Sequence, residues 1–90
     1  MTMDKELNEV KRGEQAAQVL DNPLFKESVE KVREGIIRSM ATSPLGDSET
    51  HNRLVIAMQL LNQIEKQLTD VMATGKMSAM QTDNKLKLFR

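Results

Sequence analysis

Apolar residues recur every three or four positions over two long stretches of the chain. In residues 23–42 the apolar positions are spaced by four, three, four and four: Phe25, Val29, Val32, Ile36 and Met40. This spacing is typical of an amphipathic helix with one apolar face. Asn22 followed by Pro23 is a helix-start signal, because the Asn side chain can accept a bond from a free amide and Pro at the first position lacks an amide. The pattern predicts a helix over residues 23–42.

A second and longer periodic stretch follows a turn. Residues 43–47 contain Pro44 and Gly46, and Gly46 permits the positive φ that a tight turn needs, while Asp47 can cap a following helix. From residue 48 onward, apolar positions alternate spacings of three and four as a heptad seam: Leu54, Ala57, Leu61, Ile64, Leu68 and Val71. Gly75 is a natural residue to follow a helix end. We therefore expect a helix over residues 48–74.

The apolar surface of this long helix is wider than the seam alone. Met58, Leu60 and Met72 widen it, and Val55 and Ile56 lie beside its first turns. One facing helix covers a narrower stripe than this, so part of the surface should meet either the first short helix or another subunit. The surplus predicts self-association.

The two ends of the chain show weaker patterns. Residues 1–13 alternate charges with isolated apolar positions, which indicates a flexible arm, and residues 14–20 favour a short helix. Residues 76–90 show little periodicity and predict a flexible tail. Its possible contact residues for a partner are Lys85, Lys87, Phe89 and Arg90. Together these elements predict an all-α fold, a helical hairpin with a short N-terminal third helix, assembling into an oligomeric helix bundle.

Composition narrows the class of protein. The chain has 90 residues and no cysteine, and 13 basic residues balance 13 acidic ones. A chain this short buries only about 60% of its unfolded surface, so without disulfides association is the usual remedy. Nucleic-acid-binding proteins are usually basic and carry aromatic side chains, whereas this chain has balanced charges and no Trp or Tyr. We therefore do not expect it to bind nucleic acid. No apolar run approaches the roughly 20 residues of a membrane span, and no export signal is visible, so we expect a soluble protein without a membrane partner.

Residues that could support catalysis are scarce. His51 is the one histidine, and its neighbours Ser48 and Thr50 lack an acid placed to orient it. Zinc binding needs several Cys or His ligands. Residues 74–76 resemble the end of a phosphate-binding loop, but Asp70 and Met77 occupy positions where that loop needs Gly and Ser or Thr. We expect no enzymatic activity, no cofactor and no metal.

Several caps and turns together resemble a known family. Residues 22–26 (NPLFK), 43–47 (SPLGD), 53–54, 60–61 and 74–76 are similar to the corresponding elements of short proteins from short-tailed bacteriophages, encoded among the head and tail morphogenesis genes. The similarity covers roughly residues 14–80. It implies a virion component or an assembly factor, present in the host cytoplasm during assembly and, as one option, in the virion. It implies no enzymatic site.

Two functional hypotheses follow. The first is a non-enzymatic bacteriophage structural or assembly protein that associates with itself and with other phage structural proteins. Its packing and self-association residues would be Leu54, Leu61, Ile64, Leu68 and Val71. The alternative is a small adaptor or regulator of a DNA-processing protein that contacts nucleic acid through its basic C-terminal tail. The balanced charge favours the first.

Overall fold

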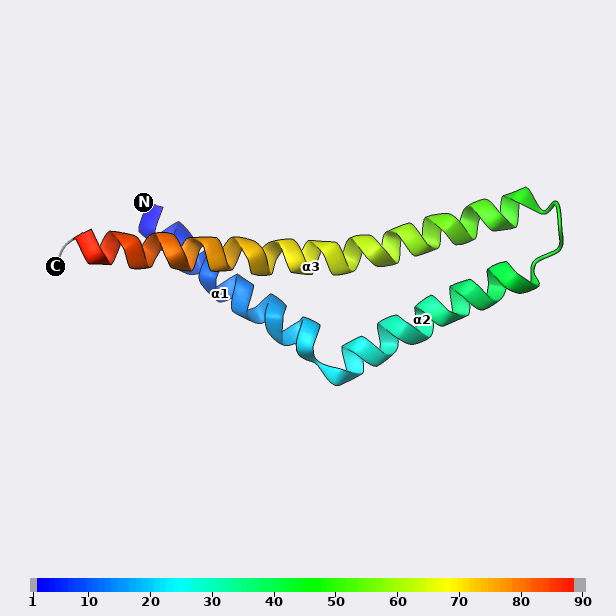
Figure 1. Cartoon of the computed structure of the whole chain (residues 1–90), viewed down its shortest axis with the longest axis horizontal. Coiled ribbons are helices and arrows are strands. Elements are labelled where there is room, and N and C mark those ends of the chain that lie inside the picture. Colours follow the sequence, from blue (N-terminus) through cyan, green and yellow to red (C-terminus); the bar gives the residue numbers. More distant parts are fainter. Residues whose placement is uncertain (1, 89–90) are drawn as a thin grey trace.

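The computed structural model describes residues 2–88, and within them the chain is entirely helical apart from two short connections. Helix α1 spans Thr2–Asp21, α2 spans Pro23–Thr42 and α3 spans Ser48–Leu88. Figure 1 shows α3 as one long rod, with α1 and then α2 following its length and meeting at an elbow that points away from α3. The predicted all-α class is confirmed.

The elbow between α1 and α2 has the predicted cap. Asn22 has an extended backbone, and its side-chain oxygen accepts hydrogen bonds from the amides of Leu24 at 2.9 Å and Phe25 at 3.1 Å. Pro23 occupies the first turn of α2. These bonds satisfy amides that would otherwise lack partners at a helix start. The predicted bounds of this helix, residues 23–42, are confirmed.

The connection between α2 and α3 also follows its sequence signals. Gly46 has a φ of 85°, the left-handed conformation that glycine adopts without a steric penalty. Asp47 then caps α3, accepting from the backbone amide of Thr50 at 3.1 Å and from its hydroxyl at 2.7 Å. Leu45, at the tip of this loop, is completely exposed.

The predictions for the two ends of the chain were wrong. Residues 2–13 are not a flexible arm but the first part of α1, and α3 continues past Gly75 to Leu88 in place of a flexible tail. The reason is mutual packing: each segment has a weak pattern alone, but in the fold each lies against the other. Phe89 and Arg90 lie outside the described residues.

Helix α3 makes most of its contacts with α1 and fewer with α2. Helix α1 runs antiparallel to the C-terminal half of α3, since Glu6 contacts Lys85 while Gly13 lies against Gly75. Helix α2 runs antiparallel to the N-terminal half, where Arg33 contacts Asn62. The expectation of a central α2–α3 hairpin with a minor third helix therefore understated the length of α1 and its share of the contacts with α3.

Candidate protein-interaction surfaces

Helices α1 and α3 approach each other closely where Gly13 lies against Gly75. A Cβ atom built on Gly75 would lie 2.8 Å from the Cα of Gly13 and 3.0 Å from the carbonyl oxygen of Glu9. Distances this short exclude a side chain, so glycine on both helices lets the two backbones touch. Ala16 and Ser78, a turn away on each helix, are also buried. Small residues therefore form the α1–α3 contact.

Beyond the glycines, polar side chains hold the first turns of α1 against the last turns of α3. Glu6 is only 8% exposed and lies 2.6 Å from the ammonium nitrogen of Lys85, with the hydroxyl of Thr82 at 3.5 Å. The hydroxyl of Ser78 donates to the carboxylate of Glu9. A buried carboxylate is costly unless it is paired, so these contacts fix the register of the two helices.

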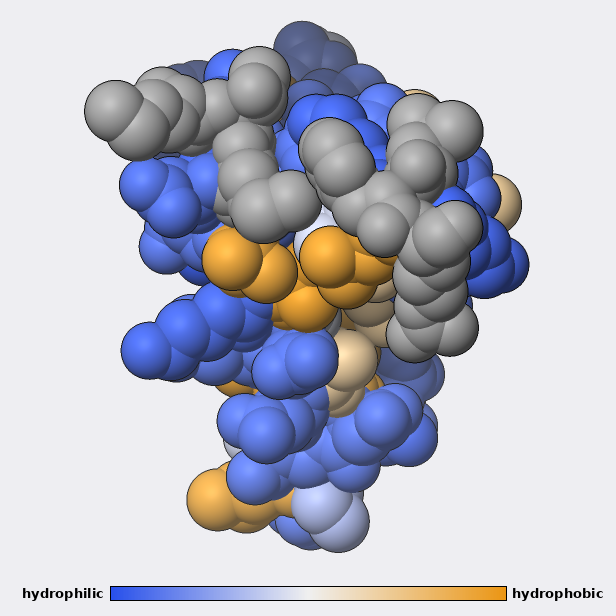
Figure 2. All heavy atoms as spheres, turned by 90° about the vertical axis from the view of Figure 1, so that its left-hand side faces the viewer, coloured by the Kyte–Doolittle hydropathy of each residue, from blue (hydrophilic) through white to orange (hydrophobic). Residues whose placement is uncertain are grey.

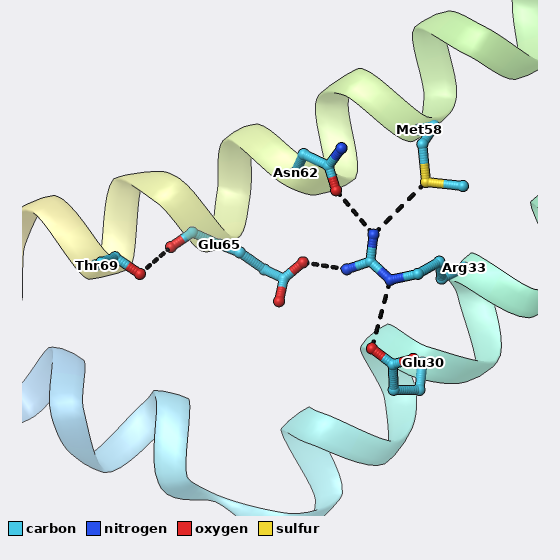
Figure 3. Close-up of polar contacts among 6 residues, drawn as sticks. All are labelled: Glu30, Arg33, Met58, Asn62, Glu65 and Thr69. Carbon is cyan, nitrogen blue, oxygen red and sulfur yellow. Dashed lines mark hydrogen bonds and ion pairs between the residues drawn. The ribbon is translucent and has the colours of Figure 1, made fainter.

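A second polar cluster joins α2 to α3 (Figure 3). The guanidinium of Arg33 donates to Asn62 at 2.8 Å, to the sulfur of Met58 at 3.6 Å and to Glu65, while Glu30 lies 3.4 Å away on the same helix. The hydrogen bond to Glu65 is the main cause that raises the pKa of Arg33 above its ordinary value. Arg33 thus joins α2 to three residues of α3, and we call this cluster of Arg33, Met58, Asn62 and Glu65 the clamp.

The apolar core of the described residues is thin. Ala16, Val29 and Ile36 are the buried apolar side chains, and no described side chain is completely enclosed. The radius of gyration is 19.3 Å, and the molecule extends over 67 × 25 × 15 Å. A compact chain of this length has a radius of gyration of about 12 Å. The molecule is an open rod with little interior of its own.

Many large apolar side chains remain exposed. They are Leu7, Val19, Leu24, Val32, Ile37, Leu45, Val55, Ile56, Leu60, Ile64, Met77, Met80 and Leu86. Seen from the end that carries the two chain termini, the coloured surface is mostly hydrophilic, and most of the apolar side chains in view lie near its centre (Figure 2). Exposed apolar residues lie on all three helices, and Leu7, Met80 and Leu86 belong to the helix turns nearest this end.

The five predicted packing residues do not all face the same way. Leu54, Leu61, Leu68 and Val71 are half-buried on the side of α3 that faces α1 and α2, whereas Ile64 is 55% exposed. Glu65 takes the half-buried position next to it and pairs with Arg33. On α2, Val32 is likewise exposed and Arg33 half-buried. Arg33 and Glu65 thus take half-buried positions beside Val32 and Ile64, two members of the predicted apolar stripes that are exposed in this chain.

The cations predicted as tail contacts are engaged within the chain. Lys85 pairs with Glu6, and Lys87 lies 3.1 Å from Asp83 one turn earlier in α3. The other two predicted tail residues, Phe89 and Arg90, fall outside the described part. His51 is half-buried in the first turn of α3.

Sequence reasoning missed the C-terminal half of the seam. The heptad spacing that ends at Val71 in apolar residues continues without a break through Gly75, Ser78, Thr82 and Lys85, and each of these is buried or half-buried. The continued alternation of three and four was the signal that could have found them. It was hidden because small and polar residues take the place of apolar ones.

Comparisons with known proteins add no further assignment. No family model, curated protein or solved structure matches this chain. Within residues 2–88, no helix is both long and apolar enough to span a membrane, and no group of three or more His, Cys, Asp or Glu side chains could hold a metal ion.

Proposed function

We propose that this chain is a non-enzymatic bacteriophage virion or assembly protein that acts by packing its helices against further copies of itself. The observation that carries the proposal is the excess of exposed surface. The chain exposes 7041 Å², whereas a compact monomer of 10.2 kDa exposes about 5,300 Å². The difference of about 1,700 Å² is surface that a self-sufficient domain would bury.

The chemistry of this surface favours a protein partner. Most of its apolar residues lie on helices, and α2 and α3 begin at capping residues, so their backbone is already ordered before association. The neutral balance of 13 basic and 13 acidic residues means that copies of the chain do not repel one another through a net field. Self-association needs no other partner to cover the exposed side chains.

The bacteriophage role is supported by the resemblance of the caps and turns to short proteins encoded among the morphogenesis genes of short-tailed phages. The residues that carry it, around Asn22, Pro44 and Gly75, include the cap of α2 and the loop before α3. Repeated copies of a small helical rod are suited to building or bracing a particle, because symmetric assemblies reuse one contact many times.

The proposed role is tested by measuring where the protein is found during phage growth. Virions and assembly intermediates are purified from cells infected with the phage that encodes the chain, and the copies per particle are counted by quantitative mass spectrometry against the major capsid protein. A fixed ratio in virions or in intermediates is expected. Absence from both would contradict the assembly role.

A further inference from the structure

The pair formed by α2 and α3 has two sides that differ in their charged residues. On α2 the side chains of Val29 and Ile36 are buried and mark the direction toward α3. Successive helical residues are about 100° apart, so Arg33 lies about 50° to one side of this direction and Val32 about 50° to the other. The two residues therefore belong to opposite sides of the pair.

The same division applies to α3. The half-buried Leu54 and Leu61 mark the direction toward α2. Relative to them, Met58 and Asn62 lie about 50–90° to one side, and Ile64 and Leu60 about 70–110° to the other. Since Arg33 contacts Met58 and Asn62, that side carries the polar clamp (Figure 3).

The side away from the clamp is apolar and open. It carries Val32, Leu60 and Ile64, which are 52%, 61% and 55% exposed. Helical spacing places Ser28, Ser39 and Gly35 of α2 beside Val32. Between residues 54 and 68 of α3 this side has no charged residue, and where it ends Arg53 pairs with Glu49 at 2.6 Å. We call this side the Val32–Ile64 face.

We propose that the Val32–Ile64 face is the contact between two copies of the chain, so that α2 and α3 of each copy form a four-helix bundle. This inference rests on the proposed self-association and assigns a surface to it. In a twofold arrangement the same face serves both copies, and Leu60 and Ile64 of each chain pack against Val32 and the small residues of the other. The Arg33 clamp remains on the outside.

The area of the exposed surface agrees with a second copy as the occupant. A stable interface buries about 800 Å² on each partner. The chain exposes 7041 Å², which is about 1,700 Å² more than a compact monomer of its mass. One such interface fits within this excess. A second copy also offers a face equally free of charge, so no ionised group is desolvated at the centre of the contact.

The test introduces a charge into the face. Leu60→Glu and, as a milder change, Leu60→Gln are compared with Val55→Glu. Val55 is a matched control because it is also an exposed apolar residue of α3, at 46%, but lies on the clamp side. Apparent masses are measured by sedimentation velocity over a concentration series, with circular dichroism to verify that helix content is unchanged.

We expect Leu60→Glu to raise the dissociation constant of the wild-type oligomer by at least about tenfold, and Val55→Glu to leave it within about threefold. Should Leu60→Glu and Leu60→Gln associate as the wild type does, the face is wrong although self-association stands. A wild-type chain that remains monomeric would instead overturn the proposed function itself. If Val55→Glu dissociates as strongly as Leu60→Glu, the contact is not confined to the Val32–Ile64 face and the assignment fails.

Discussion

Gly13 of α1 and Gly75 of α3 face each other at the point where the two helices cross, and a Cβ on either one would come within 3 Å of the other's Cα. Each glycine lowers helix propensity within its own helix. This loss of helix propensity is compensated because the two glycines let the backbones approach closely. The approach brings Ser78 to Glu9 and Lys85 to Glu6. The crossing therefore decides how the first and last segments of the chain fold together.

Replacing Gly75 by alanine tests this crossing. The new methyl group would overlap the Gly13 Cα and the Glu9 carbonyl, so we expect Gly75→Ala to lower the free energy of unfolding by about 1–3 kcal/mol. Gly35→Ala is the control, because nothing in the same chain lies within 4 Å of its Cβ position. Since Gly35 lies on the Val32–Ile64 face, both variants are compared with the wild type at a protein concentration below the dissociation constant of the oligomer. Gly35→Ala should gain about 0.5–1 kcal/mol from better helix propensity. Urea unfolding at one protein concentration measures both, and equal gains for the two variants would contradict the crossing.

The loop between α2 and α3 allows a second comparison. Gly46 has a φ of 85°, so Gly46→Val forces a β-branched residue into the left-handed region and should destabilise the fold by about 1–2 kcal/mol. Ser43→Ala removes only a local hydrogen bond to the Ser39 carbonyl and should change stability little. Thermal unfolding checks the pair, and similar small shifts for both would mean that the turn does not depend on glycine.

The cap of α3 predicts a pH dependence. The hydroxyl of Thr50 first, then its backbone amide, lowers the pKa of Asp47 below the ordinary value of 3.8. A carboxylate with a lowered pKa stabilises the fold above that ordinary value, and the contribution is lost as pH falls through the folded pKa. We expect Asp47→Ala to reduce the melting temperature at pH 7 and the difference from wild type to shrink below about pH 4. A difference that stays constant down to pH 2 would contradict the assignment.

The alternative of a DNA-binding adaptor makes a distinct prediction. Lys85 and Lys87 are paired with Glu6 and Asp83, and the chain carries no net charge. Little excess positive charge is therefore available to attract DNA phosphates. We expect no measurable DNA binding by fluorescence anisotropy at about 150 mM salt. Tight binding that weakens steeply with salt and is lost in a Lys85→Gln, Lys87→Gln double variant would favour the adaptor.

The parts of the fold that sequence reasoning found are those with local signals. Asn22 with Pro23, Gly46 with Asp47, and the apolar period of residues 23–42 each act within a few residues, so their effect is visible in sequence. The α1–α3 contact depends on residues about 60–80 positions apart, such as Glu9 with Ser78 and Glu6 with Lys85. Small and polar residues there resemble flexible ends, and Gly75 resembles a helix stop until Gly13 is placed opposite.

The candidate surface was predicted only in part for a related reason. Periodicity placed Val32 and Ile64 in the apolar stripes of their helices, but it could not show that Arg33 and Glu65 would pair across α2 and α3 and take the neighbouring half-buried positions. The width of the apolar arc on α3 was visible in sequence. Which side of this apolar surface stays exposed to solvent became clear only from the position of the clamp.

The most direct test of the account is the solution mass of the wild-type chain. Light scattering coupled to size-exclusion chromatography, over a range of micromolar concentrations, measures it without assumptions about shape, which matters for a rod 67 Å long. We expect a mass at least twice the 10.2 kDa of one chain, because the exposed apolar sides of α2 and α3 need a partner. A mass of 10.2 kDa throughout that range would contradict self-association and the function built on it.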